Sequence, residues 1–200
     1  MESLIALRDH IGDCHRCPLG ETRTNLVFGV GRADADAVFI GEAPGRNEDL
    51  RGEPFVGAAG KLLDELLASI GLQRPEVYIA NILKCRPPGN RDPQRVEIEA
   101  CAPFLREQVR MIEPRVIVTL GNFATRFVLR TTEPITRLRG TAHHAGPYTV
   151  LPIFHPAAAL YDRTKRDVLL ADFVTLGGLI SASQAEPSPA DPVQESLFGL

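Results

Sequence analysis

The sequence predicts an α/β protein, a three-layer helix–sheet–helix sandwich around a short, mainly parallel sheet of four strands. Four short runs of β-branched and other apolar residues recur along the 200-residue chain. The first three runs lack the alternation of apolar and polar residues that marks half-exposed strands, so they suit a parallel sheet buried on both faces. Longer segments with helical spacing separate the runs, and this alternation indicates right-handed β–α–β units.

In chain order, the predicted strands are residues 37–40, 77–80, 116–120 and 148–154. The first predicted helix covers residues 60–71, where leucines and an isoleucine recur at three- and four-residue spacing between two glycines. The second begins with Asp92 as its N-cap, has Pro93 at its first position and continues towards Met111. The third begins at Gly121, and the last covers residues 167–183.

The composition is that of one globular domain followed by a tail. Hydrophobic residues make up 44% of the chain and charged residues 24%, which excludes wholesale disorder, and the net charge of −3 gives no support to a globally basic nucleic-acid binder. No apolar run approaches the roughly 18–20 residues of a membrane span, and the first residues do not resemble a secretory signal. We therefore expect a cytoplasmic domain over residues 1–183 and a disordered tail over residues 184–200.

The four cysteines need an explanation, because disulfides are not expected in a reducing compartment. Cys14 and Cys17 form a C-x₂-C pair, while Cys85 and Cys101 lie far downstream. This pattern favours metal ligation over four inert thiols. Zinc and an iron–sulfur cluster both accept four thiolates, so the spacing leaves the choice open. The scattered positions differ from the compact cysteine run of ferredoxins, which argues against an electron carrier.

The active site is expected in the loops that follow the strands, because ligands of open α/β sheets bind beyond the carboxyl ends of the strands. These loops are residues 41–60, 81–92, 121–122 and 155–166. The first, second and fourth are long, polar and rich in Gly, Pro and Arg. His155 directly follows the last strand, which makes it a candidate for the chemistry.

Several motifs occur in these loops in a fixed order. Residues 41–45 read Gly-Glu-Ala-Pro-Gly, residues 54–57 Pro-Phe-Val-Gly, residues 81–88 Asn-Ile-Leu-Lys-Cys-Arg-Pro-Pro, and residues 155–157 His-Pro-Ala. Together with the order of the cysteines, these motifs resemble the family-4 uracil-DNA glycosylases, the iron–sulfur branch of their superfamily. The resemblance covers residues 4–183. It implies an enzyme of base excision repair that flips uracil out of DNA and hydrolyses its N-glycosidic bond, leaving an abasic site.

The resemblance also implies the cofactor and the catalytic residues. It makes Cys14, Cys17, Cys85 and Cys101 the ligands of a [4Fe–4S] cluster, with zinc as the less favoured occupant. His155 is placed to donate a hydrogen bond to uracil O2, where negative charge develops, and either a neutral or a cationic ring would serve. Glu42 is the carboxylate that orients water or stabilises the cationic sugar. Better-known uracil glycosylases carry an aspartate where this chain has Ala43, so the usual base is missing.

Base recognition can be argued from side-chain chemistry. The Asn81 amide presents one donor and one acceptor, which match O4 and N3–H of uracil if the amide is held in one orientation. Phe55 offers a flat ring on which a base can stack. Glu48 is expected to crowd the C5 side of the base and exclude the methyl group of thymine. We place Gly41 and Ala43 in the same substrate-binding loop.

DNA contacts must come from local positive charge, since the net charge is negative. Two loops carry it, the first with Lys84, Arg86 and Arg91 and the second with Arg163, Lys165 and Arg166. In the family, the segment after the His-Pro motif wedges the duplex. This chain has Leu160 and then Tyr161 there, where the family usually has leucine followed by arginine, so both are candidates for the wedge.

The tail ends in a second motif. Gln194 followed by Leu197 and Phe198 looks like the bacterial sliding-clamp peptide, and a flexible linker suits such docking. We expect a monomer that acts on uracil in single- or double-stranded DNA. Two alternatives stay open: a protein that binds or captures uracil-DNA without turnover and, less favoured, an iron–sulfur electron carrier.

Overall fold

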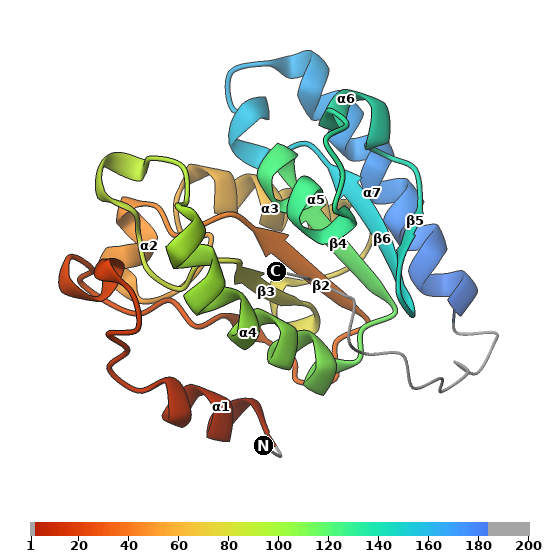
Figure 1. Cartoon of the computed structure of the whole chain (residues 1–200). Coiled ribbons are helices and arrows are strands. Elements are labelled where there is room, and N and C mark those ends of the chain that lie inside the picture. The colour runs from red at the N-terminus through yellow and green to blue at the C-terminus, as the bar shows by residue number, and fades with distance from the viewer. Residues whose placement is uncertain (1–2, 184–200) are drawn as a thin grey trace.

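The computed structural model describes residues 3–183, which form a six-stranded sheet with helices on both faces (Figure 1). The strand order is β1-β3-β2-β4-β6-β5. The strands are β1 (Val30–Gly31), β2 (Ala37–Gly41), β3 (Tyr78–Asn81), β4 (Val116–Leu120), β5 (His143–Ala145) and β6 (Tyr148–Ile153).

The prediction of an α/β sandwich is confirmed, but the prediction of four strands is wrong. All four predicted strands are present as β2, β3, β4 and β6, and they are mutually parallel. The sheet has two further strands at its edges, β1 beside β3 and β5 beside β6, and both are antiparallel. These edge strands have two and three residues, which is too short to show a hydrophobic period, so pairing with a neighbour defines them rather than their sequence.

Side chains of the central strands supply both halves of the core. Phe39 packs on one face with α3 (Ala58–Ser69) and α7 (Arg163–Ser183). Val38 and Ile40 pack on the other face with α4 (Arg95–Ile112) and α5 (Gly121–Leu129). Because successive strand residues point to opposite faces, the continuous apolar runs fill both layers.

The predicted helices are all present, with three shifted starts. α5 begins at Gly121 as predicted, whereas α3 covers Ala58–Ser69 and so begins and ends two residues before its predicted bounds. α4 begins at Arg95, not at Asp92, because Gln94 is the N-cap and forms a capping box with Glu97. α7 begins four residues before its predicted start, where the Asp162 carboxylate accepts hydrogen bonds from the main-chain N–H groups of Thr164 and Lys165.

Shorter helices connect these elements and were not predicted. They are α1 (Leu4–Ile11), α2 (Arg46–Arg51), α6 (Ile135–Leu138) and four 3₁₀ helices, η1 (Pro18–Glu21), η2 (Arg74–Glu76), η3 (Pro88–Asn90) and η4 (Pro156–Ala159). Leu7 and Ile11 of α1 pack against Phe104 of α4. This contact brings the N-terminal segment, with its C-x₂-C pair, beside the start of α4.

Candidate active site and cysteine site

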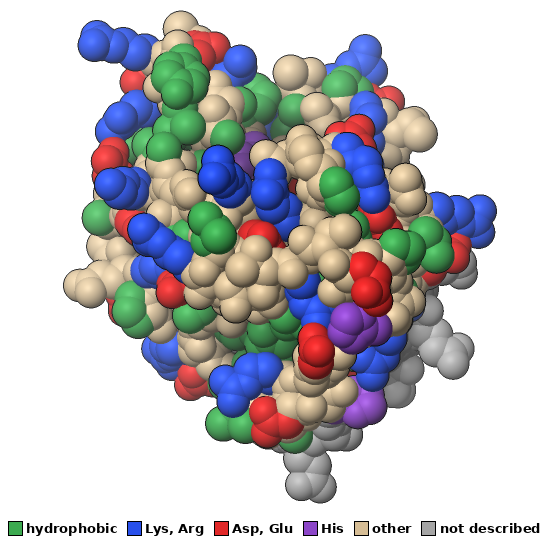
Figure 2. All heavy atoms as spheres, turned by 90° about the vertical axis from the view of Figure 1, so that its left-hand side faces the viewer, with side chains coloured by type: hydrophobic (Ala, Val, Ile, Leu, Met, Phe, Trp, Pro, Cys, Tyr) green, Lys and Arg blue, Asp and Glu red, His purple; other side chains and the backbone are tan. Residues whose placement is uncertain are grey.

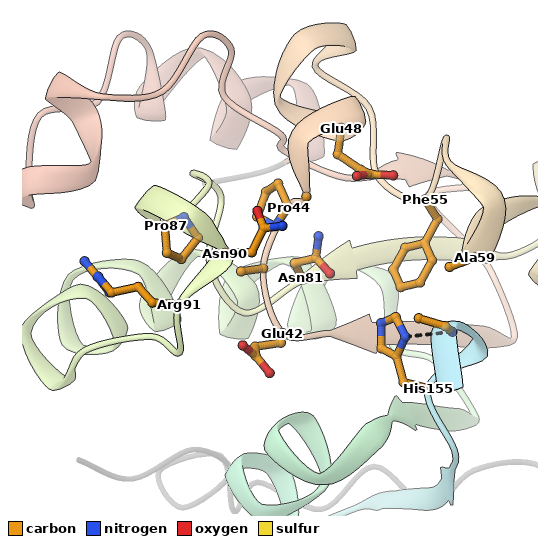
Figure 3. Close-up of a pocket in the computed structure, with 13 residues that line it drawn as sticks. Glu42, Pro44, Glu48, Phe55, Ala59, Asn81, Pro87, Asn90, Arg91 and His155 are labelled. Carbon is orange, nitrogen blue, oxygen red and sulfur yellow. Dashed lines mark hydrogen bonds between the residues drawn. The ribbon is translucent and has the colours of Figure 1, made fainter. Parts of the chain in front are cut away.

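The main pocket has a volume of about 380 Å³ and lies at the carboxyl ends of the parallel strands, as the sequence predicts. The loop after β2, the last residue of β3 and the second residue after β6 contribute Glu42, Asn81 and His155 to its wall (Figure 3). Phe55, from the segment between α2 and α3, completes this group. The pocket therefore collects four side chains that are widely separated in the sequence.

Asn81 is the buried polar group of the main pocket. Its side chain is only 2% exposed, and its Oδ1 atom has no hydrogen-bond partner among the described residues. A buried acceptor without a donor is destabilising by about 1–3 kcal/mol, so native proteins rarely keep one without a use. The amide is thus available to a ligand that presents an N–H group.

Gly41 keeps the space next to this amide open. A Cβ atom at Gly41 would lie 2.3 Å from Asn81 Oδ1 and 3.1 Å from the ring of Phe55. Any side chain at this position would therefore occupy the gap between the amide and the ring. The gap suits a planar group that stacks on Phe55 while it bonds to Asn81.

The backbone of Phe55 adopts a left-handed conformation with φ of 54°, which is uncommon outside glycine. Glu48 supports this conformation, because its Oε1 atom accepts hydrogen bonds from Val56 N (3.0 Å) and Gly57 N (3.1 Å). Gly60 also allows it, since a Cβ atom there would collide with the carbonyl of Phe55. One carboxylate oxygen of Glu48 is thus committed to shaping the loop that carries Phe55.

His155 faces the same pocket, and its ring stacks on Phe55 with 5.6 Å between the centroids. The Nδ1 atom accepts a hydrogen bond from Ala157 N at 3.1 Å, so in the neutral ring the hydrogen is on Nε2. Burial lowers the pKa of His155 to about 4, although the charge of Glu48 opposes this shift. Such a pKa favours the neutral ring at ordinary pH.

Glu42 lies between the main pocket and a side groove of about 600 Å³, which we define by Glu42, Asp92, Gly121, Phe123, Arg126 and His155. Burial raises the pKa of Glu42, and the charge of Asp92 adds to the rise. Gly121 has φ of 86°, and a Cβ atom there would lie 3.1 Å from Cβ of His155. Ala43 lines the main pocket and has no ionisable group.

The four cysteines, which we call the cysteine site, line a second cavity. Apolar side chains surround it, among them Ile11, Leu19, Leu83 and Phe104. Hydrogen bonds reach three sulfurs, two from guanidinium groups and one from a main-chain N–H: Arg16 Nη1 to Cys14 Sγ (3.4 Å), Arg23 Nη1 to Cys85 Sγ (3.6 Å) and Lys84 N to Cys101 Sγ (3.2 Å). Four thiols with two guanidinium groups bonded to them fit an anionic metal–thiolate centre.

All four thiols of the cysteine site face the same cavity, but within residues 3–183 no group of three or more Cys, His, Asp or Glu side chains is gathered closely enough to hold a metal ion. Burial raises the pKa of Cys85 to about 11 and that of Cys101 to about 12, so without a cation these thiols stay protonated.

The prediction that Lys84 contacts DNA is wrong. Lys84 is 1% exposed, and its ammonium donates hydrogen bonds to the carbonyl of Asn81 (2.8 Å) and to Oε1 of Gln108 (2.6 Å). Burial lowers its pKa to about 8. A side chain enclosed in the core cannot reach a phosphate, and hydrophobicity patterns do not reveal such a lysine.

The other basic candidates differ in their freedom to bind phosphate. Arg91 lines the main pocket but is paired with Glu97, and Arg86 donates to Asn90. Lys165 and Arg166 are paired with Asp162 and Glu65. Arg163 is exposed, as are Arg46 beside the main pocket and Arg126 in the side groove, and among the described residues no carboxylate lies within ion-pair distance of these three. Arg46 and Arg126 are candidates that the sequence analysis missed.

On the face that carries α2, Lys and Arg side chains are interleaved with Asp and Glu (Figure 2). Of the two wedge candidates, Tyr161 is 99% exposed, whereas Leu160 packs against the core. Among residues 3–183, no helix has both the length and the apolar character needed to cross a membrane. The predicted clamp peptide, with Gln194, Leu197 and Phe198, lies outside the described residues.

The comparisons with known proteins agree on one family. The model of the Uracil DNA glycosylase superfamily matches residues 28–174. The type-4 uracil-DNA glycosylase of Archaeoglobus fulgidus is 48% identical over 192 residues, which cover 92% of this chain and 96% of the relative. The proteins of that name from Sulfurisphaera tokodaii and Saccharolobus solfataricus are 44% and 45% identical, and each match covers 86% of this chain and 83% and 84% of the relative.

Proposed function

The chain belongs to the uracil-DNA glycosylase superfamily, and on that premise we propose how its residues excise uracil from DNA. The protein is a type-4 uracil-DNA glycosylase, a DNA repair enzyme that hydrolyses the bond between uracil and its sugar. One observation carries the assignment of the site: the unpartnered Oδ1 atom of Asn81, which lies beside a gap that Gly41 and Phe55 keep open.

Asn81 reads the base. Its Oδ1 atom accepts the N3–H of a flipped uracil, while its amide N–H₂ group donates to O4. Cytosine presents the opposite pattern at these positions, so it would leave the buried amide unpaired. Phe55 stacks on the base, and Gly41 and Ala43 provide the space in which the base lies.

His155 stabilises the leaving base. As the sugar–base bond breaks, negative charge grows on uracil O2, and the Nε2–H of neutral His155 is free to donate a hydrogen bond to it. Glu42, at the border of the main pocket and the side groove, is the carboxylate available to orient water or to stabilise the cationic sugar. With alanine at position 43, this role falls to Glu42.

Glu48 influences which base the pocket accepts, because it holds the loop that carries Phe55. By fixing Val56 and Gly57 it sets the position of Phe55, and with that the width of the gap that receives the base. We also keep the proposal that Glu48 crowds the C5 side of the base and so rejects the methyl group of thymine.

DNA phosphates are bound by the exposed arginines around the main pocket. Arg163, Arg46 and Arg126 are the first candidates, because no described carboxylate neutralises them, while Arg86 and Arg91 can contribute after they exchange their present partners. Tyr161 is the proposed wedge, since its ring is almost fully exposed two residues before Arg163.

We propose that the cysteine site holds an iron–sulfur cluster, as the resemblance to the family implies. The proposal is supported by four thiols that face one cavity and by the hydrogen bonds that Arg16 and Arg23 donate to two of the sulfurs. Cys14, Cys17, Cys85 and Cys101 would hold the [4Fe–4S] cluster. When bound, the cluster would tie the N-terminal segment to the loop after β3 and to α4.

Three predictions on partners and location stay open proposals. Gln194, Leu197 and Phe198 are proposed to dock on the sliding clamp. We also propose that the enzyme acts as a monomer, and that it works in the cytoplasm, where its four cysteines stay reduced.

One experiment tests the proposed function and the alternatives. The purified protein is incubated with single- and double-stranded oligonucleotides that each contain one uracil, and the products are treated with alkali. Strand breaks at uracil with many turnovers are expected. A stable protein–DNA adduct without turnover would favour capture, whereas no reaction together with a reversible optical change on reduction would favour electron transfer.

A further inference from the structure

Lys84 is a charged residue for which the proposed mechanism has no role, although it is one of the most buried side chains of the molecule. Its ammonium contacts two acceptors, the carbonyl of Asn81 at 2.8 Å and Oε1 of Gln108 at 2.6 Å, and both are neutral. Within residues 3–183, no carboxylate lies within 4.0 Å of its Nζ atom. A buried ammonium that has only neutral partners is strongly unfavourable unless a negative charge lies nearby.

The cysteine site can supply that negative charge. Lys84 itself lines the cavity of the four cysteines, its main-chain N–H donates to Cys101 Sγ at 3.2 Å, and Cys85 is the next residue in the chain. Thiolates carry negative charge when they ligate a metal. Arg16 and Arg23 are the other cations around these sulfurs. The Arg23 side chain is buried as well, but it is paired with Asp13, whereas the buried ammonium of Lys84 has no carboxylate partner among the described residues.

The ammonium of Lys84 also reaches the residue that reads the base. Nζ fixes the main-chain carbonyl of Asn81, whose side chain is the unpartnered acceptor of the main pocket. Gln108, the second acceptor, is itself held by hydrogen bonds from its Nε2 to Phe28 O (2.9 Å) and Tyr78 Oη (3.0 Å). The ammonium therefore lies between Gln108 of α4, whose side chain is held by two hydrogen bonds, and Asn81 at the end of β3.

We propose that Lys84 is a positioning residue that couples the cysteine site to base recognition. Its ammonium balances the charge of the metal-bound thiolates and, through the same atom, holds Asn81 in the orientation that reads uracil. This inference rests on the proposed function, because it takes both the metal centre and the role of Asn81 from it. The inference further predicts that removing the positive charge of Lys84 weakens metal binding at the cysteine site and base recognition in the main pocket together.

The test compares Lys84→Met, which keeps the approximate shape without charge, with Lys84→Arg, which keeps the charge. Lys61→Met is the matched control, since Lys61 is an exposed lysine on α3. For each metal-loaded protein, we would measure iron per chain and the half-time of iron release to a chelator, followed by visible absorbance. Separate kcat and KM values on a uracil oligonucleotide report the effect on the pocket.

Lys84→Met is expected to release iron on the order of 10-fold faster than the wild type, the lower end of effects seen when partners of metal ligands are removed. It is also expected to lose on the order of 10-fold in kcat/KM on uracil, mainly through kcat, since a misplaced Asn81 aligns the base poorly. Lys84→Arg should lie closer to the wild type in both measurements, and Lys61→Met should match the wild type.

Four results would overturn the proposal. Lys84→Met could keep its iron at the wild-type rate, or lose iron while it excises uracil normally. Lys84→Arg could behave like Lys84→Met, or neither Lys84 variant could fold while Lys61→Met does; each of these two results would assign Lys84 to packing alone. If instead the wild type holds no iron or leaves uracil in place, it is the proposed function that fails, so the two failures can be told apart.

Discussion

The main pocket and the cysteine site lie at opposite ends of the five residues 81–85, yet they are built in opposite ways. In the pocket, Asn81 keeps an unpartnered oxygen and His155 turns an N–H towards the hollow. At the cysteine site the walls are apolar, and the polar groups that reach the sulfurs are already bonded to them. An unpaired buried acceptor is tolerated where a ligand arrives and leaves, whereas closed apolar walls suit a group that stays bound. From this contrast we infer that the main pocket binds and releases a ligand, whereas the cysteine site holds a permanently bound group that supports the structure.

The largest expected effect tests whether the cysteine site has a structural role. Cys85→Ser should lose bound iron and lower the free energy of unfolding by on the order of 4 kcal/mol or more, because metal binding contributes directly to folding. Iron analysis and chemical denaturation measure both quantities. Asn47→Asp, at an exposed position on α2, is the control, since it should keep its iron and its stability. A Cys85→Ser protein as stable as the wild type would contradict a structural role of this site.

The next largest effect tests whether Asn81 of the main pocket binds the base. Asn81→Asp should lower kcat/KM on uracil by on the order of 10³-fold or more, since the carboxylate cannot donate to O4, and discrimination against cytosine should weaken. Single-turnover kinetics with uracil and cytosine oligonucleotides give both values. Asn47→Asp, at an exposed position on α2, is the matched control. Wild-type rates for Asn81→Asp would remove this residue from the pocket.

A smaller effect concerns the pH dependence of stability, which tests the charge of His155 in the main pocket. The pKa of His155 is about 4 in the folded protein and about 6.5 in an unfolded chain, so below pH 6.5 the unfolded state takes up a proton that the folded state does not. Stability should therefore fall as the pH drops from about 6.5 to about 4, with His155 accounting for about 1–2 kcal/mol at pH 5. Above pH 6.5 this contribution to the pH dependence is absent.

Urea unfolding at pH 7.5 and pH 5 measures this difference. His155→Gln should lose less stability between the two pH values than the wild type, while His144→Gln, which changes an exposed histidine of β5, should behave like the wild type. An equal acid sensitivity of the wild type and His155→Gln would contradict the neutral state inferred for the His155 ring.

The smallest effect concerns the exposed Tyr161, which lies between η4 and α7. Tyr161→Ala should lower uracil release from double-stranded DNA by about 10-fold and leave single-stranded DNA unaffected, because only a duplex needs a wedge to extrude the base. Val174→Ala removes another exposed apolar side chain, on α7, and serves as the control. An equal loss on both substrates would assign Tyr161 to general binding.

Sequence patterns predicted the parts of this molecule that depend on burial and on local chemistry. The parallel strands, α3 and α5 lie where apolar periodicity places them, and the pocket residues meet because the ends of parallel strands meet. Asp92 was a plausible N-cap, but the pair Gln94 and Glu97 satisfied the first N–H groups of α4 better. Several residues with the right propensity competed here, and only the folded geometry decided between them.

Lys84 shows why the rest could not be predicted. A lysine in a polar loop reads as a solvated charge, and neither its neighbours in the sequence nor any period indicates that its ammonium is enclosed by Asn81 and Gln108. The separation of Tyr161 from Leu160, and the free state of Arg46 and Arg126, likewise depend on contacts between distant segments.

The two edge strands have a consequence for the behaviour of the protein in a crowded solution. β1 has two residues and β5 has three, so an incoming chain would find only a few main-chain hydrogen bonds at either border of the sheet. Short borders are a means by which proteins avoid pairing edge to edge and aggregating. The long, hydrophobic strands are kept in the centre, where other strands already cover them. We therefore expect little edge-to-edge aggregation through this sheet, even when the protein is abundant.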